Sequence, residues 1–316
     1  MTTVLVTGAS GFVGRTLCAA LDSRGHLVRA ATRTPLDRPE RASFAVGNIG
    51  PDTDWSAALT ACDAVVHLAA HVHVMRRNAG DVAGDFHRVN AEGSENLARQ
   101  AAHAGVRRFV FLSSVKVNGE DSAQRAFVES DPVAPIDQYG VSKAEAEKKL
   151  RNIATETGME MVIVRPPLVY GPGVRANFLS LLRAVDSGVP LPLASISNLR
   201  SLVYISNLVD ALGVCLVHPA AANRTFFVSD DHDVSTPQLV REIAATLRKT
   251  PILFPFPPVL LTGLGLLTGR SDQIARLTSS LRVDISSIKS TLGWQPPFSL
   301  QQGLAETATW YRSLRR

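Results

Sequence analysis

Short apolar segments alternate with longer amphipathic ones through the first half of the chain. Turn residues or helical patterns bound the runs that predict strands, which are residues 4–7, 27–32, 43–46, 64–67, 108–112 and 161–165. Apolar residues recur at helical spacing over 12–24, 82–103 and 138–157. This alternation predicts β-α-β units, and therefore an α/β fold with a doubly wound parallel Rossmann sheet covered by helices on both faces.

The pattern changes after residue 165, where prolines and glycines interrupt the chain up to residue 200. We expect 201–205 and 208–217 to return to the sheet region, and a loop-rich, helical part to run from about 229 to a last helix over 300–315. The sequence thus predicts two interleaved domains. Residues 1–168 plus about 201–228 form the dinucleotide-binding domain, and about 169–200 plus 229–316 form a smaller C-terminal substrate domain.

The composition is that of an ordinary globular enzyme, with 45% hydrophobic and 19% charged residues. The net charge is only +5, and no run of Lys and Arg is interleaved with aromatic residues, which argues against nucleic acid as a partner. The three cysteines lack metal-ligand spacing, so we expect free thiols in a reducing compartment and no metal site: Cys18, Cys62 and Cys215. The first residues do not resemble a signal peptide, so we expect a cytoplasmic protein.

The segment 257–267 is apolar but is interrupted by proline and glycine. It also falls short of the roughly 20 residues that span a bilayer, so we expect no transmembrane segment. The pattern favours a buried or surface-lying helix of the smaller domain, and contact with a membrane surface stays an open alternative.

A glycine-rich turn follows the first predicted strand and opens the first predicted helix. In this context Gly8 permits the tight turn, Gly11 lets the backbone approach a pyrophosphate, and Gly14 lets the helix pack on the sheet. The helix then offers free N–H groups to the phosphates. The turn therefore predicts a dinucleotide site.

The end of the second strand bears on which dinucleotide is bound. A carboxylate there often holds the ribose 2′-hydroxyl of NAD, whereas an arginine can hold the 2′-phosphate of NADP. Here the sequence is Thr32-Arg33-Thr34, with no carboxylate. Arg33 can form a fork with phosphate. The sequence leaves both NAD and NADP open and slightly favours NADP.

Tyr139 and Lys143 open the helix predicted over 138–157 and share one face at i and i+4. Free tyrosine has a pKa near 10, and we expect the nearby ammonium to lower the pKa of Tyr139 toward a range useful for acid–base catalysis. Ser113 and Ser114 follow the strand at 108–112, where a serine hydroxyl can donate to a substrate oxygen. Ser114, Tyr139 and Lys143 are therefore the candidate catalytic residues.

Taken together, these motifs resemble the extended short-chain dehydrogenase/reductases, the NAD-dependent epimerase/dehydratase family. The similarity runs over essentially the whole chain and includes TGASGFVG at 7–14, HLAA at 67–70, Tyr139 with Lys143, RPPLVYGPG at 165–173 and LGWQP at 292–296. Within the family the chain is similar to the sugar-nucleotide branch typified by UDP-galactose 4-epimerase. The resemblance implies a UDP-linked sugar as substrate and a homodimer that pairs the helices at 82–103 and 138–157.

The resemblance also implies roles for individual residues. The pyrophosphate would lie against Gly8, Gly11, Phe12, Val13 and Gly14. The adenine would be flanked by Asn48 and Ile49, and the adenosine side lined by Leu68, Ala69 and Ala70. Tyr139 would exchange a proton at the C4 oxygen of the sugar, with Ser114 on the same oxygen and Lys143 on the nicotinamide ribose. Asn177 and Arg200 would grip the sugar-nucleotide diphosphate.

The chain also departs from the family pattern in ways that bear on the reaction. Sugar-nucleotide dehydratases carry Thr-Asp-Glu where this chain has Ser114-Val115-Lys116, so dehydration is disfavoured. Lys116 could instead contact the sugar, a phosphate or a 4-keto oxygen, or it could simply be solvated. His71 and His73 could face the sugar, although histidines without metal-ligand company more often pack or cap.

These departures resemble those of bacterial proteins thought to reduce UDP-4-keto-6-deoxy-N-acetylhexosamines for polysaccharide biosynthesis. Our leading expectation is therefore a 4-ketoreductase. The alternative is a C4 epimerase with tightly held NAD. A non-catalytic dinucleotide sensor is a remote third reading, because Ser114, Tyr139 and Lys143 are all present.

Overall fold

We analysed a computed structural model of the chain. It describes residues 1–35, 42–72, 79–122, 124–268 and 271–314. His73, one of the two histidines expected near the sugar, lies outside the described residues.

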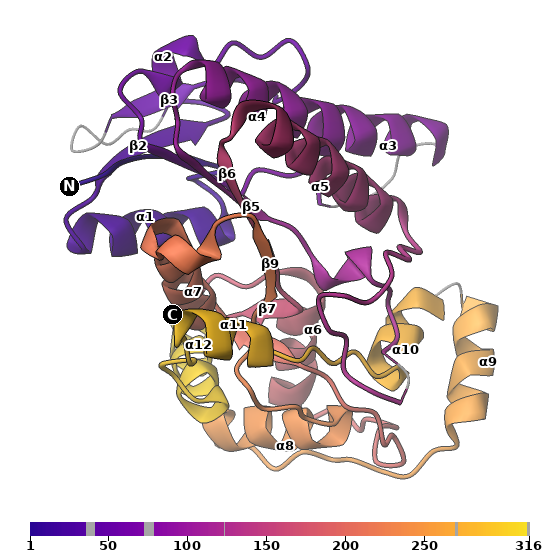
Figure 1. The fold of residues 1–316 in the computed structure, drawn as a ribbon. Coiled ribbons are helices and arrows are strands. Elements are labelled where there is room, and N and C mark those ends of the chain that lie inside the picture. Colours follow the sequence, from indigo (N-terminus) through magenta and orange to yellow (C-terminus); the bar gives the residue numbers. More distant parts are fainter. Residues whose placement is uncertain (36–41, 73–78, 123, 269–270, 315–316) are drawn as a thin grey trace.

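A seven-stranded parallel sheet forms the centre of the larger part of the molecule (Figure 1), which confirms the doubly wound α/β fold. Its order is β3-β2-β1-β4-β5-β6-β9. The strands are β1 (Thr3–Thr7), β2 (Leu27–Thr32), β3 (Ser43–Ala45), β4 (Ala64–His67), β5 (Arg108–Leu112), β6 (Glu160–Arg165) and β9 (Arg224–Phe227). The strand order reverses between β1 and β4, and in such sheets ligands bind at the carboxyl edge of this point.

Helices cover both faces of this sheet because its strands are apolar on both sides. In β1, Val4 and Val6 belong to one buried cluster and Leu5 to another. The first cluster includes residues of α1 (Phe12–Ser23) and α7 (Ile205–Val217). The second includes residues of α2 (Ser56–Leu59), α4 (Gly93–His103) and α5 (Gln138–Thr157). The 3-10 helices η2 (Val115–Val117) and η3 (Pro219–Ala221) lie in connecting segments.

The helix expected over 82–103 is not continuous. It consists of α3 (Ala79–Phe86), a π-helical segment η1 (His87–Glu92) and α4. Such π-helical insertions are rare and frequently lie at functional sites.

The smaller part of the molecule combines a two-stranded parallel sheet, β7 (Leu168–Tyr170) and β8 (Leu202–Tyr204), with helices. Residues 201–205 and 208–217 were expected to return to the sheet region. The first segment forms β8, which pairs with β7 and not with the main sheet, whose added strand is β9. The second lies in α7, which shares a core cluster with β1 of the main sheet. The helices are α6 (Ala176–Asp186), α8 (Thr236–Leu247), α9 (Pro258–Thr268), α10 (Ser271–Thr278), α11 (Ser286–Leu292) and α12 (Leu300–Ser313).

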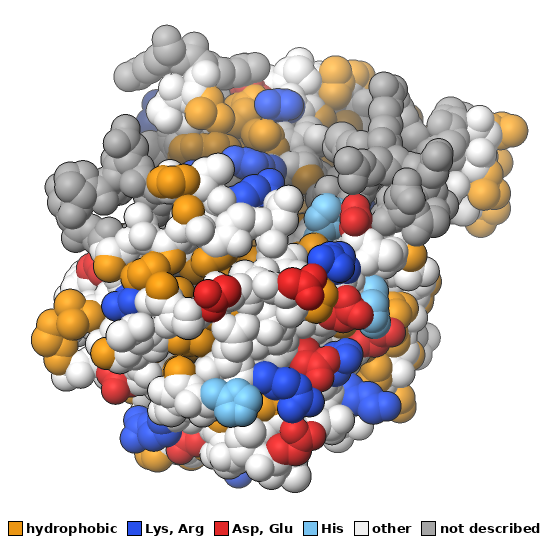
Figure 2. All heavy atoms as spheres, turned by 90° about the horizontal axis from the view of Figure 1, so that it is seen from above, with side chains coloured by type: hydrophobic (Ala, Val, Ile, Leu, Met, Phe, Trp, Pro, Cys, Tyr) orange, Lys and Arg blue, Asp and Glu red, His pale blue; other side chains and the backbone are white. Residues whose placement is uncertain are grey.

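The apolar segment near residue 260 forms α9, at the right-hand edge of the molecule in Figure 1. Hydrophobic side chains gather at the same edge in Figure 2. Within the described residues, every helix is too short or too polar to cross a membrane.

Candidate active site

A cavity of about 1680 Å³ opens along the carboxyl edge of the main sheet. Its walls come from the segments that follow six of the strands, which are residues 8–14, 32–34, 46–54, 68–72, 112–114 and 166–169. The rest of the lining comes from Ala31, Asp85, Arg88, Val89, Tyr139, Lys143 and Arg175. Pockets for one drug-sized ligand measure about 300–1,000 Å³, so this cavity has room for a dinucleotide and a second ligand.

The glycine-rich turn forms one wall of the cavity and requires glycine at two positions. Gly8 has φ of +65°, and a Cβ there would also meet the backbone of Ala69 at 3.0 Å. A Cβ on Gly14 would lie 2.1 Å from the carbonyl oxygen of Gly8. The close approach of α1 to β1 therefore depends on the absence of a side chain at Gly14.

The N-terminus of α1 faces this cavity. Gly11 is its N-cap residue and offers no side chain to cap the helix, and no acidic residue lies in the first turn. Phe12, Val13 and Gly14 all line the cavity. Free backbone N–H groups and the positive end of the helix dipole form an anion site, which suits a pyrophosphate.

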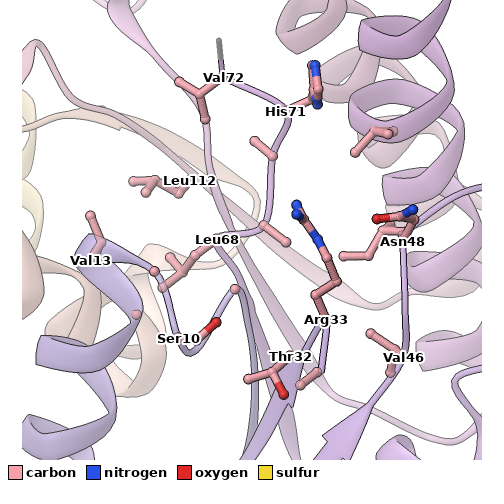
Figure 3. Close-up of a pocket in the computed structure, with 18 of the residues that line it drawn as sticks. Ser10, Val13, Thr32, Arg33, Val46, Asn48, Leu68, His71, Val72 and Leu112 are labelled. Carbon is pink, nitrogen blue, oxygen red and sulfur yellow. The ribbon is translucent and has the colours of Figure 1, made fainter. Parts of the chain in front are cut away.

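The opposite wall carries Arg33 and Asn48, which extend into the cavity from the ends of β2 and β3 (Figure 3). Leu68, Ala69, Ala70 and Ile49 line it as well. Arg88, from η1, also lines the cavity and is paired with Asp52 at 3.0 Å. This end of the cavity thus presents two guanidinium groups, one of them neutralised by a carboxylate.

The three candidate catalytic residues line the same cavity. Ser114 follows β5 and caps η2, accepting a hydrogen bond from the Lys116 N–H at 3.2 Å. Tyr139 and Lys143 lie in the first turns of α5, which Asp137 caps by accepting from the Gly140 N–H at 2.7 Å. The structure shows that the three residues line one cavity, whereas their catalytic roles stay predictions.

Burial shifts the pKa values of both residues of the pair toward their neutral forms. The pKa of Lys143 falls to about 7 because burial disfavours the ammonium, although Glu147 acts in the opposite direction. Burial, helped by the negative charge of Asp137, raises the pKa of Tyr139. The expectation that Lys143 lowers the pKa of Tyr139 is therefore wrong in this structure. The Lys143 ammonium instead donates to the Leu112 carbonyl at 2.8 Å and lies over the Phe111 ring.

A buried ion pair lies one helical turn beyond Lys143. Glu147 accepts hydrogen bonds from Arg165 Nε at 2.8 Å and Nη2 at 2.5 Å, and from the Ser113 hydroxyl at 2.6 Å. Arg165 also donates to the Asn118 side chain at 3.0 Å. We did not single out Glu147 from the sequence, although its i+4 spacing from Lys143 places it on the same helix face.

His67 joins the glycine turn to η1 through a directed chain of hydrogen bonds. Thr7 Oγ1 accepts from the N–H groups of Leu68 and Ala69, so its own hydrogen points to His67 Nδ1 at 2.6 Å. The opposite ring nitrogen donates to Ser94 Oγ at 2.8 Å, and Ser94 donates to the Asn90 carbonyl at 2.6 Å. This chain requires neutral imidazole, and burial, with the nearby Lys143, lowers the pKa of His67 to about 3.

Asn90, in η1, holds two walls of the cavity together. Its side chain accepts from the His71 N–H at 2.7 Å and donates to the His71 carbonyl at 3.0 Å. It also donates to Ser142 at 3.0 Å, and Ser142 donates to the Tyr139 carbonyl at 2.8 Å. His71 lines the cavity, and its ring lies against Phe86.

The three residues expected to bind the sugar nucleotide do not line the cavity. Lys116 is paired with Glu120 and Asp137. Arg200 donates to the Ser279 carbonyl at 3.0 Å, and Asn177 is exposed in the first turn of α6. Their substrate contacts stay predictions. Sequence reasoning missed Arg175, the N-cap residue of α6, which does line the cavity.

A glycine turn, an uncapped helix N-terminus and a Ser/Tyr/Lys set on one parallel sheet define a dinucleotide-binding enzyme of the Rossmann type. Residues 4–228 match the NAD dependent epimerase/dehydratase family, and the chain belongs to this family. It is an enzyme of the extended short-chain dehydrogenase/reductase type, as the motifs predicted.

Proteins with named activities align with nearly the whole chain. A UDP-glucose 4-epimerase from Vibrio cholerae is 47% identical over 308 residues, which are 96% of this chain and 94% of the relative. An N-acetyl-alpha-D-glucosaminyl-diphospho-ditrans,octacis-undecaprenol 4-epimerase from Escherichia coli O157:H7 is 28% identical over 318 residues, covering 96% and 93% of the two chains. The structure of MoeE5 in complex with UDP-glucose and NAD superposes with a TM-score of 0.79 at 26% identity, covering 99% of this chain and 100% of MoeE5.

Proposed function

We propose that this enzyme interconverts the C4 epimers of a UDP-linked hexose or N-acetylhexosamine, with NAD held in the same cavity. The observation that carries the proposal is that Ser114, Tyr139 and Lys143 line one cavity with the glycine turn. The similarity to a UDP-glucose 4-epimerase at 47% identity supports this reaction over the 4-ketoreductase that we expected first.

The residues present fit a dinucleotide. Gly8, Gly11 and Gly14 line the cavity without side chains, and the uncapped N-terminus of α1 suits the pyrophosphate. Asn48 and Ile49 would flank the adenine, Leu68 to Ala70 would line the adenosine side, and Lys143 would hold the nicotinamide ribose. When bound, NAD would supply the acceptor for the C4 hydride and the donor for its return to the opposite face of the sugar.

The chain's own residues handle the proton at the C4 oxygen. Tyr139 would take the proton of the C4 hydroxyl as the hydride leaves, and would give it back when the hydride returns. Ser114 would donate a hydrogen bond to the same oxygen and so polarise the transient ketone. Lys143, in its charged form, would stabilise the phenolate form of Tyr139 that accepts this proton and is restored when the proton is given back. The cycle is closed, since one proton and one hydride are removed and restored.

The proposed epimerase activity is tested by asking whether the enzyme turns over without added cofactor and carries bound NAD. Purified enzyme is incubated with UDP-glucose, and separately with UDP-N-acetylglucosamine, with no cofactor added. Formation of the galacto epimer in either reaction, together with NAD released on denaturing the protein, supports the proposal. A Tyr139→Phe variant serves as the control for contaminating activity.

A 4-ketoreductase is the second candidate, and Arg33 favours it. Arg33 lines the cavity at the end of β2, where it could bind the 2′-phosphate of NADPH. Stoichiometric oxidation of NADPH with a UDP-4-keto-6-deoxy-N-acetylhexosamine, without interconversion of the UDP-sugars above, would establish the reductase instead.

A further inference from the structure

Lys116 has surroundings that neither of its expected roles explains. We expected it to contact the substrate or to be solvated, yet its ammonium donates to the carboxylates of Glu120 and Asp137, and its side chain is only 25% exposed. It does not line the cavity. An isolated surface ion pair contributes little to stability, whereas several charges in a network can fix the segments that carry them.

Lys116 joins the two segments that carry the catalytic residues. It lies in η2, two residues after Ser114, and its backbone N–H donates to the Ser114 hydroxyl oxygen at 3.2 Å. That bond uses the oxygen of Ser114 as an acceptor and leaves its hydrogen to donate to a substrate oxygen. The ammonium of the same residue reaches Asp137, the N-cap residue of α5, whose first turn carries Tyr139.

Asp137 uses its two carboxylate oxygens for different partners. Oδ1 accepts from the Gly140 N–H at 2.7 Å and so caps α5, while Oδ2 accepts from the Lys116 ammonium. Burial favours the neutral form of Asp137, but the hydrogen bonds from Lys116 and from the Gly140 N–H outweigh burial, and the pKa of Asp137 lies below its ordinary value. Asp137 therefore carries a negative charge close to Tyr139, and Lys116 compensates that charge.

The start of α5 also packs directly on the backbone of η2. A Cβ on Gly140 would lie 2.7 Å from the carbonyl oxygen of Lys116, so the two segments approach one another as closely as a glycine allows. Because protein interiors are close-packed, a displacement of one segment is passed to the other. Lys116 thus touches α5 twice, through its carbonyl oxygen and through its ammonium.

We propose that Lys116 is a positioning residue, which fixes the Ser114 hydroxyl and the Tyr139 phenol relative to one another and does not itself bind the substrate. The inference rests on the proposed function, in which both groups act on the same C4 oxygen. A misplacement of about 1 Å can cost up to about 10²-fold in rate. Without Lys116, the carboxylates of Asp137 and Glu120 would repel one another and move the cap of α5.

The kinetics of UDP-sugar interconversion by full-length Lys116→Met test the positioning role. We expect kcat to fall by about ten- to a hundredfold and KM to stay within about twofold of the wild type, because the catalytic groups lose their alignment while the substrate loses no contact. Lys116→Arg keeps the charge and should retain most of the activity. Lys149→Met is the matched control with wild-type kcat, since Lys149 is a partly exposed lysine that pairs with Glu95 farther along α5.

A second substitution separates the charge of Asp137 from the packing around it. In Lys116→Met/Asp137→Asn the asparagine can still cap α5 but has no charge to repel Glu120, so kcat should recover to within about threefold of the wild type. If Lys116→Met fails to fold, Lys116→Gln takes its place, because the glutamine keeps a hydrogen-bond donor and loses the charge.

Hydrogen exchange at the Gly140 and Val141 amides tests the positioning contact without a substrate. Both amides donate to Asp137 and should exchange faster in Lys116→Met than in the wild type. Faster exchange in a protein that does not interconvert UDP-sugars would contradict the proposed function alone. Unchanged exchange would overturn the positioning role whatever reaction the cavity catalyses.

The kinetic outcomes that would overturn the proposal are equally distinct. An unchanged kcat in Lys116→Met would show a solvated lysine, and a raised KM with unchanged kcat would show a substrate contact. An equal fall of kcat in Lys149→Met, or no recovery on adding Asp137→Asn, would show that the loss does not come from the charge beside Tyr139.

Discussion

Tyr139 and Lys143 occupy adjacent turns of α5, and burial favours the neutral form of each. A phenol that keeps its proton cannot accept the proton of the C4 hydroxyl, and a partly neutral lysine is a weak stabiliser of the phenolate that could accept it. Glu147 is the group that opposes the loss of charge on Lys143. The catalytic competence of the pair therefore depends on a carboxylate that does not line the cavity.

Replacement of Tyr139 by phenylalanine removes the hydroxyl and little else. General acid–base catalysis typically contributes about 10²- to 10⁴-fold, so we expect kcat to fall by that order in Tyr139→Phe. The amount of bound NAD and the thermal melting temperature should stay those of the wild type. Turnover within a few-fold of wild type would remove Tyr139 from the mechanism.

Glu147→Gln tests the positioning role of the buried carboxylate. Loss of its charge lowers the pKa of Lys143 further, so the loss of activity as the pH rises through that pKa should begin at lower pH than in the wild type. The variant also leaves Arg165 with a weaker partner, and breaking a buried pair costs about 3–5 kcal/mol.

The pH profile of kcat separates this effect from simple destabilisation. Arg151→Met is the matched control, because Arg151 approaches the same carboxylate from an exposed position at 3.5 Å. A pH profile of Glu147→Gln that overlies the profiles of the wild type and of Arg151→Met would contradict the positioning role.

Among the elements, those defined by local pattern were predicted well. The strands that became β2, β4 and β5, and the helix α5, have the predicted bounds because periodicity and turn residues are local properties. The pairing of β8 with β7 and the addition of β9 were missed, since strand partners are chosen by contacts between distant segments. The π-helical η1 was missed because its apolar spacing resembles that of an α-helix.

The candidate site was likewise predicted where it depends on local pattern and missed where it depends on contacts between distant segments. The glycine turn, Ser114, Tyr139 and Lys143 follow strands or open a helix, so the sheet topology alone brings them to one edge. Lys116 and Arg200 were harder to place, because their partners Glu120, Asp137 and Ser279 are set by loop conformation. Sequence patterns carry little information about such contacts.

Two helical glycines, Gly14 in α1 and Gly84 in α3, should respond in opposite ways to substitution by alanine. In Gly14→Ala the new Cβ meets backbone atoms, so the helix must move, at a cost of about 1–3 kcal/mol and with loss of bound NAD. In Gly84→Ala the Cβ enters open space within α3, which should raise stability by about 0.5–1 kcal/mol. Denaturant unfolding and cofactor content of the two variants provide the measurement. Equal effects of the two changes would contradict the close packing described at Gly14.

For the whole molecule, the neutral His67 makes stability depend on pH. In the unfolded chain its pKa is about 6.5, while in the fold it is about 3. The unfolded state therefore binds one more proton than the folded state between these values. The stabilisation is fully present above about pH 6.5 and is lost as the pH falls toward 3, by about 1.4 kcal/mol per pH unit.

Denaturant unfolding of the wild type and of His67→Asn at about pH 7, 6 and 5 measures the contribution of His67 to the free energy of unfolding. These pH values run from just above the unfolded pKa into the range between the two pKa values. Asparagine does not titrate there, so the free energy of unfolding of the variant should fall less steeply on acidification. Other titrating groups contribute alike to both proteins. Parallel curves would show that His67 is not the buried base responsible.

The π-helical η1 has a consequence for how this protein tolerates changes in length. An α-helix advances about 100° per residue, so the wider turn of η1 accommodates one residue more than a regular helix over the same rise. Deleting a residue within 87–92 would let α3 and α4 merge into a continuous helix with its hydrogen bonds intact. Asn90 would then rotate away from His71 and Ser142, leaving a well-folded helix and a cavity whose walls are no longer joined. A deletion in this segment would thus preserve helical content while disrupting the geometry of the cavity.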